Sequence, residues 1–208
     1  HQVTCQFATG VTLFGPISLS LEPALCGLVG RNGCGKTRLL RLLAGLDLPA
    51  SGHIERFGSV AYVAQQHVIS PSTTLAELLG YDAVFAARRR IESGDYLPED
   101  LERMEGFWDL EERLTGAFMD ASLPPFNPER PAVTLSGGER VRALLCAALM
   151  ADADYLLLDE PTAGLSQETA QAMMTGIIQE LDNTGRTLLI ITHDLPLAGR
   201  LAQIISLT

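Results

Sequence analysis

Lysine is almost missing from this sequence, and acidic residues outnumber basic ones. Lys36 is the only lysine among 208 residues, and the formal net charge is −10. An acidic chain is unsuited to binding nucleic acid over a broad surface by charge attraction. Only a local basic patch could bind it. The longest uncharged apolar run, 143–151, is far shorter than the roughly 20 residues that cross a bilayer. The composition therefore argues against a protein that coats nucleic acid and against a membrane span.

Cysteine is also scarce, and its four copies show no pairing pattern. Cys5, Cys26, Cys34 and Cys146 form neither a CxxC pair nor a metal-binding spacing, which predicts reduced thiols. No secretory signal is recognisable, so we expect a cytoplasmic protein. Hydrophobic residues make up 47% and charged residues 19%, a mixture typical of a folded chain with one large domain or two small ones.

Short apolar segments alternate with amphipathic ones, a pattern typical of a parallel sheet flanked by helices. Strands are predicted at 17–21, 25–29, 60–64, 155–158, 187–192 and 204–207. Helices are predicted after Gly35, from near Gly138 and over 167–181. A capping box at Thr74 and a proline-rich stretch ending at Pro131 indicate an inserted helical segment between two α/β halves. We therefore expect an α/β core of residues 1–69 and 132–208, with a helical subdomain at 70–131.

A glycine-rich loop carries the single lysine. Residues 30–37 fit the pattern GxxxxGK[ST] and stand between a predicted strand and a predicted helix. The glycines let successive N–H groups turn towards phosphate oxygens, and the new helix adds positive potential from its dipole. Lys36 would give a compact charge to the β- and γ-phosphates, where a planar arginine fits poorly, and Thr37 would offer its hydroxyl to Mg²⁺. The predicted phosphate-binding residues are Gly30, Arg31, Asn32, Gly33, Cys34, Gly35, Lys36, Thr37 and Arg38.

Two carboxylates follow the hydrophobic strand predicted at 155–158. Ligands of open α/β sheets bind at the carboxyl ends of the strands, which is where Asp159 and Glu160 stand. By itself the pair could be a solvated acidic turn. Beside a phosphate-binding loop, it predicts that Asp159 holds Mg²⁺ and that Glu160 polarises the attacking water.

The segment 135–139 reads Leu-Ser-Gly-Gly-Glu and predicts a second anion-binding site, at the N-terminus of the helix that follows it. Ser136, Gly137 and Gly138 precede a strong helix, so a hydroxyl and bare amides lie at its N-terminus. An ordinary Ser/Gly helix cap is the simpler interpretation of this segment alone.

Together these ordered motifs resemble the nucleotide-binding domain of ATP-binding cassette (ABC) proteins over essentially the whole chain. The resemblance implies an Mg²⁺-dependent ATPase of P-loop fold, with a mostly parallel sheet, N-terminal antiparallel strands and an inserted helical subdomain. It further implies that Gln65 joins Mg²⁺ and the nucleophilic water, that His193 contacts the γ-phosphate, and that Phe7 stacks on adenine. Phe14 is the competing aromatic, but its neighbours predict a core position.

The resemblance also implies a partner. Two cassettes of this family pair head to tail, and the loop 30–37 of one and Ser136–Gly138 of the other enclose each ATP. We therefore expect a second cassette, either in a longer chain or as a second copy of this one.

Two branches of the family remain open. The long stretch between Gln65 and Ser136, with Arg88–Gly94 and Trp108–Arg113, is most similar to the first cassette of ABC-F proteins, which implies a role on the ribosome. The arginine run 88–90 could contact rRNA, although a solvated helix face is the simpler interpretation.

The sequences Thr-Ala-Gly-Leu at 162–165 and Ile-Thr-His-Asp at 191–194 instead resemble transporter cassettes, whose partner is a membrane permease. Directly after the first of these, Ser166 stands where ABC-F members usually carry Asp, and it could simply cap the next helix. The chain is thus expected to be part of a longer ABC-F protein or a separate transporter subunit. A nucleotide-binding module that hydrolyses poorly is a weaker third interpretation, against which Lys36, Glu160 and His193 count.

Overall fold

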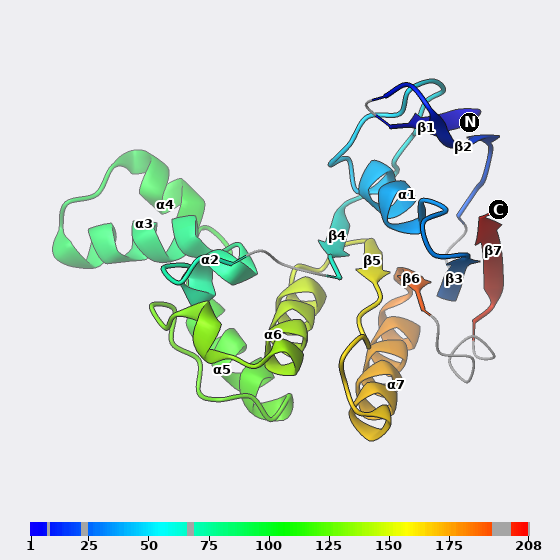
Figure 1. The fold of residues 1–208 in the computed structure, drawn as a ribbon. Helices are drawn as coiled ribbons and strands as arrows, with labels where there is room; N and C mark the ends of the chain where they lie inside the picture. The colour runs from blue at the N-terminus through cyan, green and yellow to red at the C-terminus, as the bar shows by residue number, and fades with distance from the viewer. Residues whose placement is uncertain (8, 22–24, 66–68, 193–200, 208) are drawn as a thin grey trace. The chain divides into compact units, whose positions relative to one another are not determined.

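The computed structural model describes residues 1–7, 9–21, 25–65, 69–192 and 201–207 (Figure 1). The chain divides into two compact units. The first comprises residues 1–66 and 151–208, and the second comprises residues 67–150. The insertion predicted at 70–131 lies inside the second unit, which also contains the helix at 137–150.

A five-stranded parallel sheet in the order β4-β5-β6-β3-β7 forms the centre of the first unit. Its strands are β3 (Leu25–Gly30), β4 (Val60–Val63), β5 (Tyr155–Asp159), β6 (Thr187–Ile191) and β7 (Gln203–Leu207). Helices α1 (Lys36–Leu43) and α7 (Gln167–Thr184) lie on opposite faces of this sheet (Figure 1). The central strands are continuous apolar runs because both of their faces are covered. This arrangement confirms the predicted α/β fold class.

An antiparallel pair, β1 (Val3–Gln6) and β2 (Thr12–Ile17), stands apart from the parallel sheet. The strand predicted at 17–21 is wrong, because β2 ends at Ile17. Ile17 pairs with Val3, the first residue of β1, so the pairing of the two strands stops there. The alternation that suggested a strand has another cause: Leu19 and Leu21 pack against the hydrophobic core beyond the end of β2.

The main core of the first unit lies between the antiparallel pair, α1 and the parallel sheet. Its buried members include Phe14, as the sequence predicted, together with Val3, Cys5, Cys26, Leu28, Leu39, Leu40, Leu42, Leu157, Leu189, Ile191 and Leu207. Helix α7 buries a separate apolar stripe that includes Met174, which confirms the amphipathic helix predicted there. Ser166 caps α7 by accepting a hydrogen bond from the N–H of Thr169, and Gly185 ends it with a φ of 67°.

Helices and turns make up the second unit. Its elements are α2 (Leu75–Leu79), α3 (Asp82–Ser93), α4 (Pro98–Met104), α5 (Leu110–Asp120), the short 3₁₀ helix η1 (Ala132–Thr134) and α6 (Gly137–Met150). The predicted capping box is present at α2: the Thr74 side chain accepts from the N–H of Glu77, and the Glu77 carboxylate accepts from the N–H of Thr74. Within the described parts of the chain, none of the helices combines the length and the hydrophobicity that a membrane span requires.

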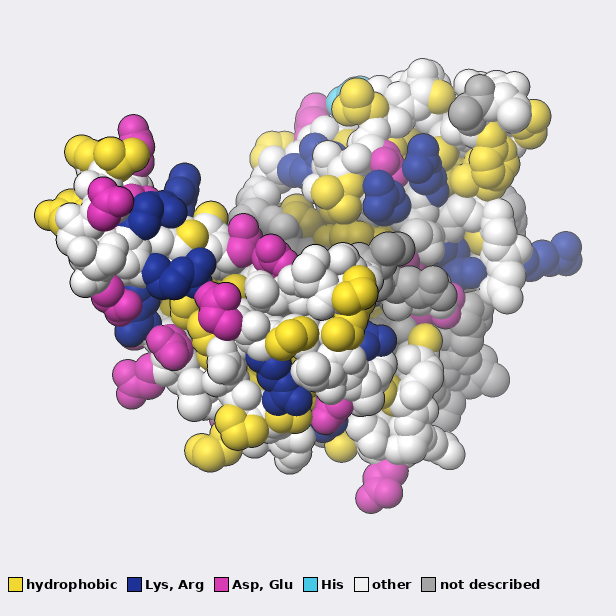
Figure 2. Space-filling model, turned by 60° about the vertical axis from the view of Figure 1, so that its left-hand side comes forward, with side chains coloured by type: hydrophobic (Ala, Val, Ile, Leu, Met, Phe, Trp, Pro, Cys, Tyr) yellow, Lys and Arg dark blue, Asp and Glu magenta, His cyan; other side chains and the backbone are white. Residues whose placement is uncertain are grey.

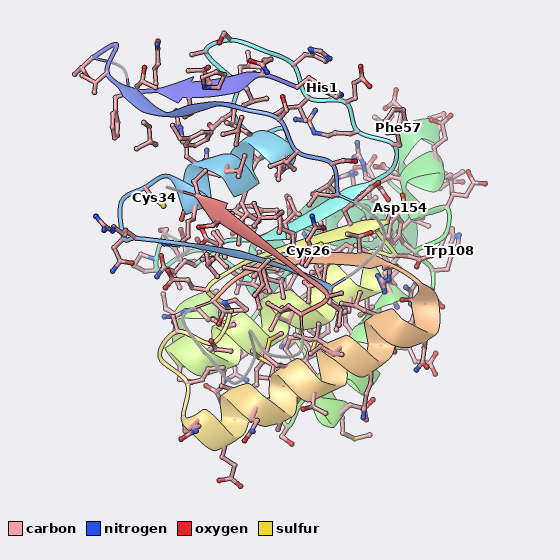
Figure 3. The ribbon with its side chains drawn as sticks, turned by 90° about the vertical axis from the view of Figure 1, so that its right-hand side faces the viewer. His1, Cys26, Cys34, Phe57, Trp108 and Asp154 are labelled. Carbon is pink, nitrogen blue, oxygen red and sulfur yellow. The ribbon has the colours of Figure 1, made fainter. Side chains whose placement is uncertain are left out.

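The carboxyl ends of the parallel strands meet at one edge of the sheet. There β3 leads into the glycine-rich loop, β4 is followed by Gln65, and β5 ends at Asp159. Figure 3 shows Cys34, in that loop, and Asp154, which precedes β5, at opposite ends of the sheet. The predicted phosphate and metal residues of the first unit therefore belong to this one edge.

We expect Leu28→Ala, at the centre of β3, to lower the free energy of unfolding by about 2–5 kcal/mol, because it leaves a cavity in a core where Leu28 is 0% exposed. The matched control is Leu48→Ala, because Leu48 is 90% exposed and its loss should change stability by no more than about 0.5 kcal/mol. Urea unfolding followed by circular dichroism measures both. Equal effects of the two substitutions would contradict the assignment of the core.

Candidate functional site

The glycine-rich loop curls around the side chain of its own lysine. Gly33 and Gly35 have φ values of 81° and 101°, in the left-handed region that favours glycine. Lys36 is the first residue of α1 and is buried. Its Nζ donates hydrogen bonds to the carbonyl oxygens of Gly30, at 3.0 Å, and Arg31, at 3.1 Å. The ammonium therefore lies within the turn that the sequence predicted for phosphate.

The other loop residues differ in exposure and partners. Arg31 and Asn32 are exposed, and Cys34 is partly buried. Arg38 follows on α1 and pairs with Asp47, at 3.1 Å between Nη1 and Oδ2. Gly35 has a packing reason besides its backbone angle, because a Cβ there would come within 2.6 Å of the ring of Phe14.

The hydroxyl of Thr37 and the carboxylate of Asp159 meet although 122 positions separate them. Thr37 Oγ1 donates to Asp159 Oδ1 at 3.2 Å, and Tyr62 donates its phenolic hydroxyl to Asp159 Oδ2 at 3.3 Å. Asp159 is 1% exposed. Burial raises the pKa of Asp159, whereas the hydrogen bonds from Thr37 and Tyr62 oppose that rise. Burial, followed by the charge of Asp159, raises the pKa of Tyr62 to about 12.

Gln65 and Glu160 form the second contact at this edge. Gln65 Nε2 donates to Glu160 Oε2 at 2.8 Å. Glu160 adopts a left-handed backbone with a φ of 49°, which is uncommon for a residue with a side chain, and its N–H donates to the carbonyl oxygen of Ile191. The structure thus brings together four predicted residues, Thr37, Asp159, Gln65 and Glu160, in two hydrogen-bonded pairs.

Ser136 directly precedes α6 in the second unit and forms reciprocal hydrogen bonds with Glu139 of that helix. The N–H of Ser136 donates to Glu139 Oε2 at 2.7 Å, and the N–H of Glu139 donates to Ser136 Oγ at 3.3 Å. Hydrogen bonds from the Ser136 side chain and backbone lower the pKa of Glu139. Ser136 and Gly137 are exposed and Gly138 is partly buried, so the start of α6 is accessible to a ligand.

The family resemblance alone assigned Gln65, Phe7 and His193, and the structure describes the first two of these residues. Phe7 is 53% exposed, directly after β1, whereas Phe14 is 4% exposed in the core. His193 lies outside the described residues. Tyr62 was missed by the sequence analysis, because a tyrosine in a short apolar strand resembles an ordinary core residue.

The arginine run at 88–90 is neutralised inside the second unit. Arg88 pairs with Glu92 and Glu111, Arg89 with Glu129, and Arg90 with Asp100. The ion pair with Arg90, followed by the N–H of Leu97, lowers the pKa of Asp100 to about 2. Figure 2 shows basic and acidic side chains interspersed over the helical unit. The run therefore forms an ion-paired helix surface and not a free basic patch.

A lysine enclosed by a glycine-rich loop, with acidic side chains at the carboxyl edge of a parallel sheet, defines a P-loop nucleotide-binding protein. Comparison with known proteins identifies the family. The ABC transporter family matches residues 14–163, so the chain belongs to it. The chain is accordingly an ABC cassette that binds ATP and acts as an ATPase.

Three relatives illustrate the range of the family. The nickel import ATP-binding protein NikO of Rhodobacter capsulatus is 35% identical, over 95% of this chain and 80% of NikO. The energy-dependent translational throttle protein EttA of Mycobacterium tuberculosis is 32% identical, over 86% of this chain and 34% of EttA. The dimeric structure of the ATP-binding cassette MJ0796, in a post-hydrolysis state with ADP and Pi, superposes with a TM-score of 0.76 over 100% of this chain and 92% of that chain, at 21% identity.

We expect Lys36→Ala to weaken ATP binding by about 1.5–3 kcal/mol, or roughly 10- to 100-fold in Kd, because a charge-assisted contact with the phosphates is lost. Lys36→Arg should also weaken binding, since a planar guanidinium fits this enclosed position poorly. Isothermal titration calorimetry measures both affinities, and circular dichroism checks the fold. An unchanged Kd in Lys36→Ala would rule out the predicted phosphate contact.

Proposed function

We propose that this cassette hydrolyses ATP with Mg²⁺ and that it does so paired head to tail with a second cassette. The single observation that carries the proposal is the pair of contacts at the sheet edge, Thr37 with Asp159 and Gln65 with Glu160. These contacts support the proposal because the residues that we assign to the metal and to the water lie beside the loop that encloses Lys36. The dimeric MJ0796 cassettes supply the precedent for pairing.

The donor set at Thr37 and Asp159 suits Mg²⁺. A hydroxyl and a carboxylate are hard oxygen donors, and Mg²⁺ is usually held by one or two such groups together with substrate phosphates. Thr37 and Asp159 would hold the ion, with Gln65 as a further oxygen donor. When bound, Mg²⁺ would neutralise charge on the phosphate oxygens.

Each of the remaining residues has a separate role toward the nucleotide or the attacking water. Lys36, with the N–H groups of the loop, binds and orients the phosphates. Glu160 orients the attacking water and accepts its proton, and the Gln65 amide holds the Glu160 carboxylate in place. Phe7, exposed after β1, packs against the adenine, and His193 contacts the γ-phosphate. Ser136, Gly137 and Gly138 of the partner cassette close the second side of the nucleotide.

We further propose that the ATPase powers import or export through a membrane permease. NikO and other relatives are named as transport ATP-binding proteins, and the neutralised arginine run offers no free patch for rRNA. A soluble ABC-F role on the ribosome is the second candidate. The match to EttA and the sequence at Trp108–Arg113 favour it.

Glu160→Gln is expected to slow ATP hydrolysis by about 10²- to 10⁴-fold, because the attacking water loses its general base, while ATP affinity stays close to that of the parent. The trapped ATP should also convert the protein to a dimer, measurable by light scattering. Glu180→Gln, the same change at an exposed position late in α7, is the control and should leave turnover unchanged. Normal turnover in Glu160→Gln would remove Glu160 from the mechanism.

Purification from native cells distinguishes the two roles. We expect tagged Glu160→Gln protein, purified with ATP from detergent-treated cells, to carry a polytopic membrane protein in stoichiometric amount. Gel analysis for rRNA and mass spectrometry for membrane proteins are run on the same eluate, with Lys36→Ala as the control that cannot be trapped by nucleotide. Recovery of intact ribosomal subunits in place of a permease would support the ABC-F role and refute the transport role.

A further inference from the structure

The buried carboxylate of Asp159 is held at both of its oxygens by neutral hydroxyl groups. Oδ1 accepts from Thr37, at the start of α1, and Oδ2 accepts from Tyr62, on β4. Thr37 is already assigned to the metal by its place in the loop. Tyr62 has no assigned role, yet its hydroxyl contacts the same carboxylate from the opposite oxygen.

From this arrangement we propose that Tyr62 is a positioning residue for the metal: its hydroxyl fixes the orientation of the Asp159 carboxylate so that Oδ1 stays directed at Thr37. The inference rests on the Mg²⁺ site of the proposed function. A carboxylate with one oxygen anchored cannot rotate freely about its Cβ–Cγ bond. Groups that orient a metal-binding side chain in this way are general features of metal sites.

The charges around Asp159 show why a neutral donor matters there. Lys36 lies near enough to favour the negative charge, but its Nζ donates to Gly30 and Arg31. Glu160, next in the chain, disfavours the charge. Asp159 is buried, and within the described parts of the chain its side chain accepts hydrogen bonds from two hydroxyl groups, one of which belongs to the residue assigned to the metal.

The sheet explains why residues of β4 and directly after it can contact both Asp159, the last residue of β5, and Glu160, which follows it. β4 and β5 are parallel neighbours, with Tyr62 paired to Leu157 and Val63 to Leu158 (Figure 1). Tyr62 then contacts Asp159, and Gln65, three residues later, contacts Glu160. The end of β4 thus supplies one side-chain contact to each of the two consecutive carboxylates.

Tyr62→Phe tests the proposal, because it removes one oxygen and keeps the ring that packs against the core. Mn²⁺ replaces Mg²⁺ as the probe, and its binding to the ATP-loaded protein is measured by electron paramagnetic resonance. We expect an affinity about tenfold weaker than in the parent. ATP affinity in EDTA and the urea midpoint of unfolding should stay near the parent values. The Mg²⁺ concentration for half-maximal hydrolysis should rise, whereas kcat at saturating Mg²⁺ should change little.

The controls separate three outcomes. Tyr81→Phe removes the hydroxyl of a partly buried tyrosine that packs against Phe107 in the second unit, and it should leave Mn²⁺ affinity unchanged. Asp159→Asn should abolish tight Mn²⁺ binding, and if it does not, the proposed metal site itself fails. If Asp159→Asn weakens Mn²⁺ binding but Tyr62→Phe does not, only the role of Tyr62 is overturned. Equal loss of Mn²⁺ affinity, metal-free ATP affinity and stability in Tyr62→Phe would also overturn it, in favour of a purely structural hydroxyl.

Discussion

The contact between Thr37 and Asp159 depends on the register of the parallel sheet, and the rest of the site depends on that contact. Leu28 on β3 and Asp159 on β5 both pair with Ile191 on the strand between them. Two strand spacings, about 10 Å, therefore separate the backbone of Asp159 from that of β3. The glycine-rich loop and the first turn of α1 cover this distance and bring Thr37 within 3.2 Å of the carboxylate. A shift in register would separate the two groups.

Two charged side chains are buried at this edge, and both rely on neutral partners. Lys36 donates to carbonyl oxygens, and Asp159 accepts from hydroxyl groups. Burial disfavours the charge of Asp159 relative to water, and the neutral hydrogen bonds that it accepts oppose that effect. A polyanion beside the lysine and a cation beside the carboxylate would each give a stronger partner. This is the electrostatic reason why a nucleotide and a metal ion suit the site together.

Motif spacing predicted which residues lie together at the sheet edge better than it predicted the N-terminal strands. The loop at 30–37, the carboxylates at 159–160 and the cap at Ser136 were all predicted, because each is a local pattern whose chemistry follows from residue type and neighbouring elements. The strand predicted at 17–21 was wrong, because alternation records which side chains are buried and not which backbone they pair with. Leu19 and Leu21 are partly buried without belonging to β2. The sequence did not distinguish Tyr62 from a core residue, because its hydrogen-bond partner, Asp159, lies 97 positions away in the chain.

The motifs of the sequence resemble those of ABC cassettes, and the family match confirms that resemblance. The glycine-rich loop with its single lysine, the two acidic residues after a buried strand and the helical segment follow from local periodicity, glycine placement and charge, which act over a few residues. Folding brings Thr37 and Tyr62 to one carboxylate and Gln65 to Glu160, and it pairs the arginine run with Glu111, Glu129 and Asp100. Those contacts join segments far apart in the chain, so their existence depends on strand order, register and helix packing.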